Sequence, residues 1–264
     1  MEKRKQDFLN PTIKENPLKI ILLAAAFAIG MGNGIKAQTK YVTIQGTVAD
    51  YAERPIEGAS VFVQDENFKD LYQTKTDGKG HYRLKIPKGK YPYLSAIREE
   101  NYANSPRFNG KVDEAKLEFW SWGFVADKDT TLNIHYDKME VYGVHVFRVR
   151  GAGPYLNIFA RPMSIQRTIR WMAQKTPAAH LAPTMDRLKV EVFVDGEAVK
   201  VVQKQPLAEY VAEGQTMDAC LITVAEPKNK PRGMYRVFRV VMEDLDNGDK
   251  GEALYYDTLQ ECTK

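Results

Sequence analysis

The sequence predicts an all-β protein made of two β-sandwich domains, the second of them Ig-like. Short segments alternate apolar and polar residues, turn residues recur about every ten positions, and helical spacing is nearly absent. The chain has 264 residues, of which 44% are hydrophobic, enough for two cores. We predict a signal peptide at 1–37, a first sandwich at 38–142 and a second at 143–264.

The N-terminal segment is typical of a secretory signal peptide. Basic residues precede the apolar run at 20–29, and small residues follow it, so we place cleavage after Ala37. A run of ten residues is short beside the ~20 that a membrane-spanning helix needs, which makes a permanent anchor the weaker alternative. We therefore expect an exported protein, periplasmic or extracellular, with no stable membrane span after cleavage.

The net charge of +4 comes mainly from this signal segment. Residues 1–37 carry six basic and three acidic side chains, so the remaining chain has a net charge of +1. Without a cluster of basic side chains we expect no nucleic-acid partner.

The first strands are predicted from period-two alternation. In the segment 81–86, Tyr82, Leu84 and Ile86 share one face while charged residues share the other, as in an antiparallel sheet that is wet on one side. The preceding stretch 77–80, Asp-Gly-Lys-Gly, is predicted to be a hairpin turn. It has a single carboxylate, whereas calcium needs six to eight oxygen ligands.

The second half continues in the same style. Asp195-Gly196 predicts a hairpin with a primed turn, and 246–248 predicts another. The stretch 163–175 fits a helix through Ile165, Ile169 and Met172 and equally fits a strand. The boundary between the domains falls near Gly143, where one strand can run from the first domain into the second.

Four turn-rich segments of the first half together resemble the carboxypeptidase regulatory-like domain. The resemblance covers 41–142, and the segments that carry it are 45–48, 55–61, 74–82 and 87–91. It implies a seven-stranded, transthyretin-like (prealbumin-like) sandwich that serves as an accessory module in exported proteins. The signal segment and domain order are similar to small exported proteins of Bacteroidetes-type bacteria, which implies no particular activity.

The two cysteines, Cys220 and Cys262, allow two interpretations. In an oxidising compartment they would form one disulfide, which could contribute ~3–4 kcal/mol by closing a loop of about 40 residues. Alternatively Cys220, inside an apolar stretch, is a buried thiol and Cys262 is free near the C-terminus.

Catalytic and metal-binding patterns are missing from the sequence. The four histidines have no metal-ligand spacing, the acidic segment 243–252 departs from the calcium-loop pattern, and there is no nucleophile elbow. We expect no metal, no cofactor and no enzymatic activity. The alternative is a hydrolase of carbohydrate or peptide that uses acids such as Glu140 or Asp186.

The strongest functional signal is the aromatic segment 117–124. Alternation along a strand places Trp120, Trp122 and Phe124 on one face. If exposed, this face would bind sugar rings or a partner's side chain; if buried, it would be part of the core. We therefore predict a non-catalytic structural or interaction module at the cell envelope, with protein or carbohydrate as partner; glycan binding through these aromatics is the specific alternative.

Overall fold

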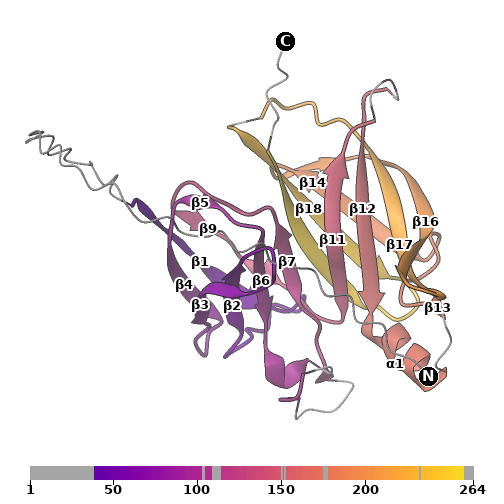
Figure 1. The fold of residues 1–264 in the computed structure, drawn as a ribbon, viewed down its shortest axis with the longest axis horizontal. Helices are drawn as coiled ribbons and strands as arrows, with labels where there is room; N and C mark the ends of the chain where they lie inside the picture. The colour runs from indigo at the N-terminus through magenta and orange to yellow at the C-terminus, as the bar shows by residue number, and fades with distance from the viewer. Residues whose placement is uncertain are drawn as a thin grey trace, which may run out of the picture. The chain divides into compact units, whose positions relative to one another are not determined.

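The computed structural model describes residues 39–102, 105–108, 114–149, 151, 153–174, 178–231 and 233–258. The predicted signal peptide and Cys262 lie outside these ranges. Residues 39–264 cluster as one compact unit. The described residues are mostly strands, with one α-helix and one 3-10 turn (Glu99–Asn101), so the all-β prediction is confirmed (Figure 1).

The largest sheet has eight strands in the order β15-β14-β18-β19-β7-β6-β2-β3. The bounds are β2 Ser60–Gln64, β3 Asp70–Lys75, β6 Tyr93–Ile97, β7 Phe119–Trp122, β14 Leu188–Val194, β15 Glu197–Val199, β18 Tyr235–Asp244 and β19 Lys250–Thr258. Its strands come from both halves of the chain, and they meet where β19 pairs in parallel with β7.

Three smaller sheets accompany it in the described part of the chain. The four-stranded sheet is β10-β1-β4 with β9 on β1, the five-stranded sheet is β11-β12-β17-β13 with β16 on β17, and β5 pairs with β8. The bounds are β1 Tyr41–Ala49, β4 His81–Pro87, β5 Gly89–Lys90, β8 Val125–Ala126, β9 Thr130–Thr131, β10 Ile134–His135, β11 Met139–Phe147, β12 Tyr155–Ser164, β13 Ala178–Ala179, β16 Val201–Ala212 and β17 Gln215–Ala225.

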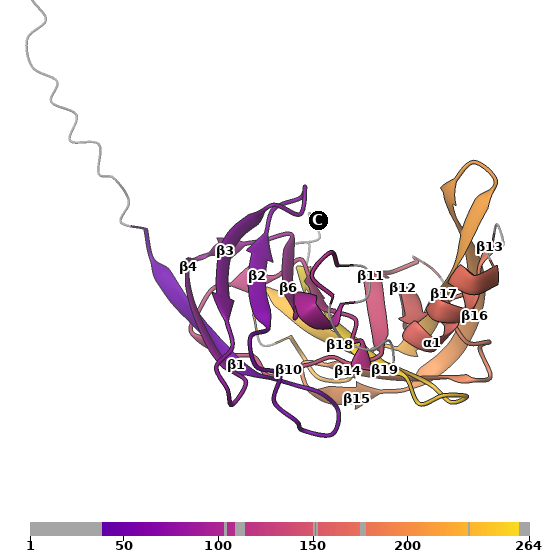
Figure 2. The same cartoon turned by 90° about the horizontal axis from the view of Figure 1, so that it is seen from below.

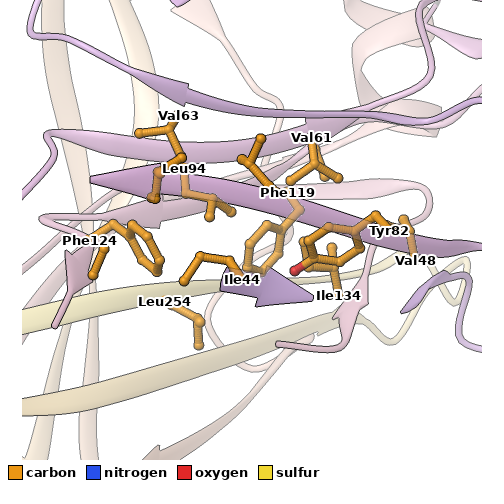
Figure 3. Packing of buried hydrophobic residues seen from close by; sticks show 14 of the residues in the cluster. Ile44, Val48, Val61, Val63, Tyr82, Leu94, Phe119, Phe124, Ile134 and Leu254 are labelled. Atoms are coloured by element: carbon orange, nitrogen blue, oxygen red, sulfur yellow. The ribbon is translucent and has the colours of Figure 1, made fainter. Parts of the chain in front are cut away.

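The first core lies between the four-stranded sheet and one face of the eight-stranded sheet. Ile44 and Val48 of β1 meet Val61, Leu94 and Phe119 of the larger sheet in this core (Figure 3). In β4 the alternate residues predicted to be buried are buried, because one face of an antiparallel strand packs on the core while the other stays in water.

The second core lies on the opposite face of the eight-stranded sheet, against the five-stranded sheet. β19 contributes to both cores, with Leu254 in the first and Ala253 in the second. The predicted boundary near Gly143 falls inside β11, where Gly143 has φ +66° at a shift of register between Tyr142 and His145. That boundary stays a prediction.

The predicted turns form, with one difference. Asp195 and Gly196 have positive φ and connect β14 to β15 as a hairpin. The 77–80 turn, however, links two sheets and does not make a hairpin, since β3 pairs with β2 while β4 pairs with β1. Gly80 has φ +75°, and a Cβ there would lie 2.5 Å from the carbonyl oxygen of Val48.

The ambiguous stretch 163–175 contains both structures that the sequence allowed. β12 ends at Ser164, and α1 (Ile165–Gln174) follows at once (Figure 2). The carboxylate of Asp249 accepts hydrogen bonds from the Ser164 hydroxyl at 2.5 Å and from the Gln166 amide at 3.2 Å, which caps the start of the helix.

Candidate functional site

Trp120 and Trp122, which the sequence predicts to share one strand face, lie together in a larger group of aromatic rings. Trp120 and Trp122 point to the same side of β7 and stack with ring centroids 5.3 Å apart. The neighbours that join them come from three other segments of the chain. We call the whole group the aromatic cluster: Phe68, Tyr93, Trp120, Trp122 and Tyr142.

The two tyrosines meet the tryptophans edge-on. Tyr93 of β6 lies 5.1 Å from Trp122 and 6.1 Å from Trp120, and Tyr142 of β11 lies 5.0 Å and 5.5 Å from the same rings, with planes nearly perpendicular. Edge-to-face contacts are the favourable geometry for aromatic pairs. The two indoles therefore contact the rings of Tyr93 and Tyr142, whose strands belong to different sheets.

The cluster has a buried base, which is Trp120, and a rim that remains accessible to solvent, which consists of Phe68, Tyr93, Trp122 and Tyr142. Trp120 is 6% exposed and belongs to the second core. Tyr93, Trp122 and Tyr142 are half-buried, and Phe68 is 44% exposed. The structure therefore gives a mixed answer to the question of whether the aromatics are buried: Trp120 is core, while the rim keeps contact with solvent.

Phe124, the third predicted residue, is not part of the cluster. It is fully buried in the first core, edge-on to Tyr256 with centroids 5.3 Å apart. β7 ends at Trp122, and Gly123 has φ +63°, so the alternation stops one residue before Phe124. A left-handed residue reverses the side to which the next side chain points, which the sequence analysis did not anticipate.

Phe68 is a cluster residue that the sequence analysis missed. It lies in the turn between β2 and β3 with φ +60°, a region that a phenylalanine rarely adopts. Asp65 holds this turn, because its Oδ1 accepts hydrogen bonds from the amides of Asn67 and Lys69. The Phe68 ring consequently stacks on Tyr93 at 4.6 Å and 6°.

Two carboxylates lie beneath the cluster. The indole Nε1 of Trp120 donates a hydrogen bond of 2.8 Å to Oε1 of Glu140, which is 4% exposed. Burial, followed by the neighbouring charge of Glu118, raises the pKa of Glu140 well above its usual range. Burial also raises the pKa of Glu118 to about 7. The pair therefore carries less than two full negative charges near neutral pH.

Arg161 of β12 fixes the outer side of the cluster. Its guanidinium lies 5.1 Å from the centre of the Tyr142 ring, a cation–π contact. The same guanidinium donates two hydrogen bonds, of 2.8 and 2.6 Å, to the carboxylate of Glu209. This bidentate pair anchors the arginine and leaves Tyr142 little freedom.

A polar groove extends from the cluster along the same face of the eight-stranded sheet. Residues directly opposite each other in neighbouring strands have side chains on the same sheet face. Trp122 is opposite Tyr93, and the pairs Tyr93–Gln64, Ser95–Phe62 and Phe62–Gln73 continue this face across β6, β2 and β3. The groove has a volume of about 340 Å³. The residues that line this polar groove are Gly58, Ser60, Phe62, Asp70, Gln73, Lys75, Glu99, Glu100 and Arg107.

Hydrogen bonds connect the cluster to the groove. The Gln64 side chain, cross-strand from Tyr93, donates to Asp70 Oδ1 at 2.9 Å and accepts from the Ser95 hydroxyl at 3.1 Å. Half-exposed rings and ordered polar groups thus lie next to each other on one sheet face.

The other residues considered from sequence have ordinary structural surroundings. Cys220 is a buried thiol whose Sγ lies 3.5 Å from the Ala160 carbonyl, and burial raises its pKa to about 12. With Cys262 outside the described residues, the disulfide stays a prediction. Asp186 is exposed, and a hydrogen bond from the Thr184 side chain lowers its pKa below the ordinary value.

The acidic residues of 243–252 have partners within the protein. Asp244 binds the Arg167 guanidinium at 2.6 and 3.1 Å, and Asp246 binds Arg167 and Arg187, each at 2.6 Å. Across the described ranges, no three His, Cys, Asp or Glu side chains are placed to hold a metal ion together. None of the helices in those ranges is long and apolar enough to cross a membrane.

Comparison with protein families supports the resemblance found in the sequence. Residues 43–103 match the family model of the carboxypeptidase regulatory-like domain, which confirms the resemblance over that segment. No curated protein matches the chain.

Solved structures give weak likenesses only. The major pilin subunit of Bacillus cereus is 13% identical with a TM-score of 0.26, over 83% of this chain and 70% of the pilin. A candidate carbohydrate-binding protein from Bacteroides uniformis is 10% identical with a TM-score of 0.27, over 83% and 99% of the two chains. At such TM-scores neither likeness supports a functional assignment.

Proposed function

We propose that this protein is a non-catalytic, exported binding protein, and that the aromatic cluster with the adjoining polar groove is its carbohydrate-binding surface. The observation that supports this is the continuity of half-exposed rings and hydrogen-bonding side chains on one face of the eight-stranded sheet. A sugar presents an apolar face bordered by hydroxyl groups, and it needs both features at once.

The rim residues have separate roles in this proposal. Trp122 receives the apolar face of a sugar ring, and Tyr93, nearly perpendicular to it and covered by Phe68, borders the surface together with Phe68. Gln73, Lys75 and Asp70 of the groove supply donors and acceptors for hydroxyl groups.

The two carboxylates beneath the cluster, buried Glu140 and partly buried Glu118, do not favour the hydrolase alternative. Glu140 is 4% exposed, and its Oε1 is occupied by the Trp120 indole. A glycosidase needs both carboxyl groups beside the glycosidic bond. Glu118 and Glu140 instead act from below, where they fix the orientation of Trp120.

Isothermal titration with a panel of neutral oligosaccharides tests the proposal. We expect one class to bind the wild type and the Trp122→Ala variant to lose at least about fivefold in affinity, since ring stacking contributes about 1 kcal/mol or more. Trp171→Ala, in helix α1, is the matched control and should bind like the wild type. The proposal is wrong if no panel member binds, or if Trp122→Ala binds unchanged while both variants keep the native circular dichroism spectrum.

A protein partner is the second candidate, and the exposure of Phe68 favours it. A phenylalanine that is 44% exposed on a turn held by Asp65 can insert into a pocket of another protein. Failure of every glycan, together with association that Phe68→Ala abolishes, would establish this alternative.

A further inference from the structure

A second cavity of different chemistry lies away from the aromatic cluster. This junction cleft has a volume of about 810 Å³, within the ~300–1,000 Å³ typical of small-molecule sites. Its walls come from six segments: the loop after β1, the end of β6 with the 3-10 turn, the residues before β7, the β10–β11 turn, the first turns of α1 and the β18–β19 hairpin. The lining is mainly polar and charged.

Most of the acidic groups in the cleft are already paired inside the protein. Asp50 accepts hydrogen bonds from the amides of Ala52 and Arg54 and from the Arg54 guanidinium, and Lys116 lies 3.4 Å away. Lys116 also binds Asp137 at 2.5 Å. Asp249 is committed to the start of α1, so that helix end is occupied and the site does not depend on it.

The basic groups are not balanced in the same way. Lys138 precedes β11 and Arg170 lies on α1, and both line the cleft. Among the described residues neither side chain forms an ion pair within 4.0 Å. Arg98, a third basic residue of the lining, has only a 3.7 Å contact with the exposed Glu100. The lining holds five basic side chains (Arg54, Arg98, Lys116, Lys138 and Arg170) and four acidic ones (Asp50, Glu114, Asp137 and Asp249). Lys138 is attracted by the charge of Asp249 without a direct ion pair, so Lys138 and Arg170 keep donors that a bound anion can use.

Amide groups add neutral hydrogen-bonding partners beside these cations. Asn101 and Gln166 both line the cleft. A guanidinium and an ammonium bind carboxylate or sulfate through charge-assisted hydrogen bonds, while amides suit hydroxyl groups. A polar lining of this kind is poor for an apolar ligand but matches a hydroxylated anion.

We infer that the junction cleft is a second binding site, specific for an anionic saccharide, with Lys138 and Arg170 holding its carboxylate or sulfate group. The ring hydroxyl groups meet Asn101 and Gln166, and Arg98 borders the cleft on the side of β6. This site is separate from the carbohydrate surface proposed above and does not require it.

Titration of the full chain with charged and neutral probes tests the inference. The probes are digalacturonate, a sulfated disaccharide, the neutral galactose disaccharide and inorganic sulfate. We expect an anionic disaccharide to bind at least tenfold more tightly than the neutral one, and its affinity to fall as sodium chloride rises from 50 to 500 mM. Preference for digalacturonate or for the sulfated disaccharide identifies the anionic group; equal affinity for charged and neutral probes overturns the inference.

Two double variants locate the site. Lys138→Ala with Arg170→Ala should lose at least tenfold in affinity, whereas Lys200→Ala with Arg83→Ala, both outside the cleft, should bind like the wild type. Unchanged binding by the first pair contradicts the inference, as does binding of inorganic sulfate alone with no saccharide. Trp122→Ala should keep this affinity, so failure here and failure of the aromatic surface can be told apart.

Discussion

At β7, the two faces of the eight-stranded sheet differ in how far they are covered by another layer. On one face Phe119 packs among hydrocarbon side chains of β1, β2 and β6 and is 1% exposed (Figure 3). On the other face Trp120 binds a buried carboxylate, and Trp122 two residues on is half-buried. The first face stays covered by the four-stranded sheet, whereas the cover of the second face ends with Tyr142 of β11.

The difference shows where a binding surface can arise in a sandwich. A sheet face is core as far as another layer covers it, and partly buried aromatic side chains such as Tyr93 and Trp122 mark the border where that cover ends. Beyond this border the same sheet face carries the polar groove. The proposed carbohydrate surface therefore lies where the cover ends, and the following variants test that distinction.

The largest effect is expected on the covered face. Phe119→Ala should lower the free energy of unfolding by about 3–5 kcal/mol, because the cavity it leaves is closed on all sides. Trp122→Ala should cost only about 1–2 kcal/mol, since its ring is only partly buried and the variant also removes a buried Nε1 that has no hydrogen-bond partner among the described residues. Guanidinium denaturation measures both, and equal losses would mean that both faces are core.

The next effect concerns the buried carboxylate. Trp120→Phe removes the donor to Glu140 and should cost about 2 kcal/mol, because the buried oxygen loses its hydrogen bond. Glu140→Gln keeps an acceptor oxygen but removes the charge that burial disfavours, so we expect little loss or a gain at pH 8. Glu140→Leu removes the acceptor, so the double variant Trp120→Phe, Glu140→Leu should lose less than the sum of its two single variants; strict additivity would show that the residues do not interact.

A pH effect should follow from Glu118. Burial raises its pKa from the ordinary 4.5 to about 7, so the folded protein favours the neutral acid. This contribution to stability is complete below pH 4.5 and is lost as pH rises towards 7. Other carboxylates also titrate, so the measurement is the difference in urea midpoint between the wild type and Glu118→Gln, followed from pH 4 to 8. A difference that stays constant over this range contradicts the prediction.

Local patterns in the sequence predict only part of this arrangement. Period-two alternation correctly places Trp120 and Trp122 on one side of β7, and Asp195-Gly196 correctly marks a hairpin. Phe124 goes to the opposite side because the left-handed backbone at Gly123 interrupts the strand; the glycine permits that angle, but the alternation of apolar residues continues across it and does not show the interruption. The confirmed family match covers 43–103, which ends before either tryptophan.

The remaining features depend on contacts between distant segments. The parallel pairing of Ala253 with Trp120 joins strands more than a hundred residues apart, and it creates the shared sheet. Glu140 reaches the indole from β11, and Phe68 reaches Tyr93 from the β2–β3 turn. Alternation can show which side of a strand a residue occupies, but it cannot show which strand lies beside it.

The smallest effect on stability, and the most specific test of the border, is expected at Phe68. Phe68→Gly removes the strain of the left-handed backbone, which is worth about 1 kcal/mol, but it also loses a ring contact of about 0.5–1.5 kcal/mol. These contributions oppose each other, so the free energy of unfolding should change by less than about 1 kcal/mol. Phe68→Leu keeps the strain and loses the ring, so it should be the less stable of the two in urea denaturation. The reverse order would show that the φ of +60° at Phe68 carries no strain that glycine can relieve.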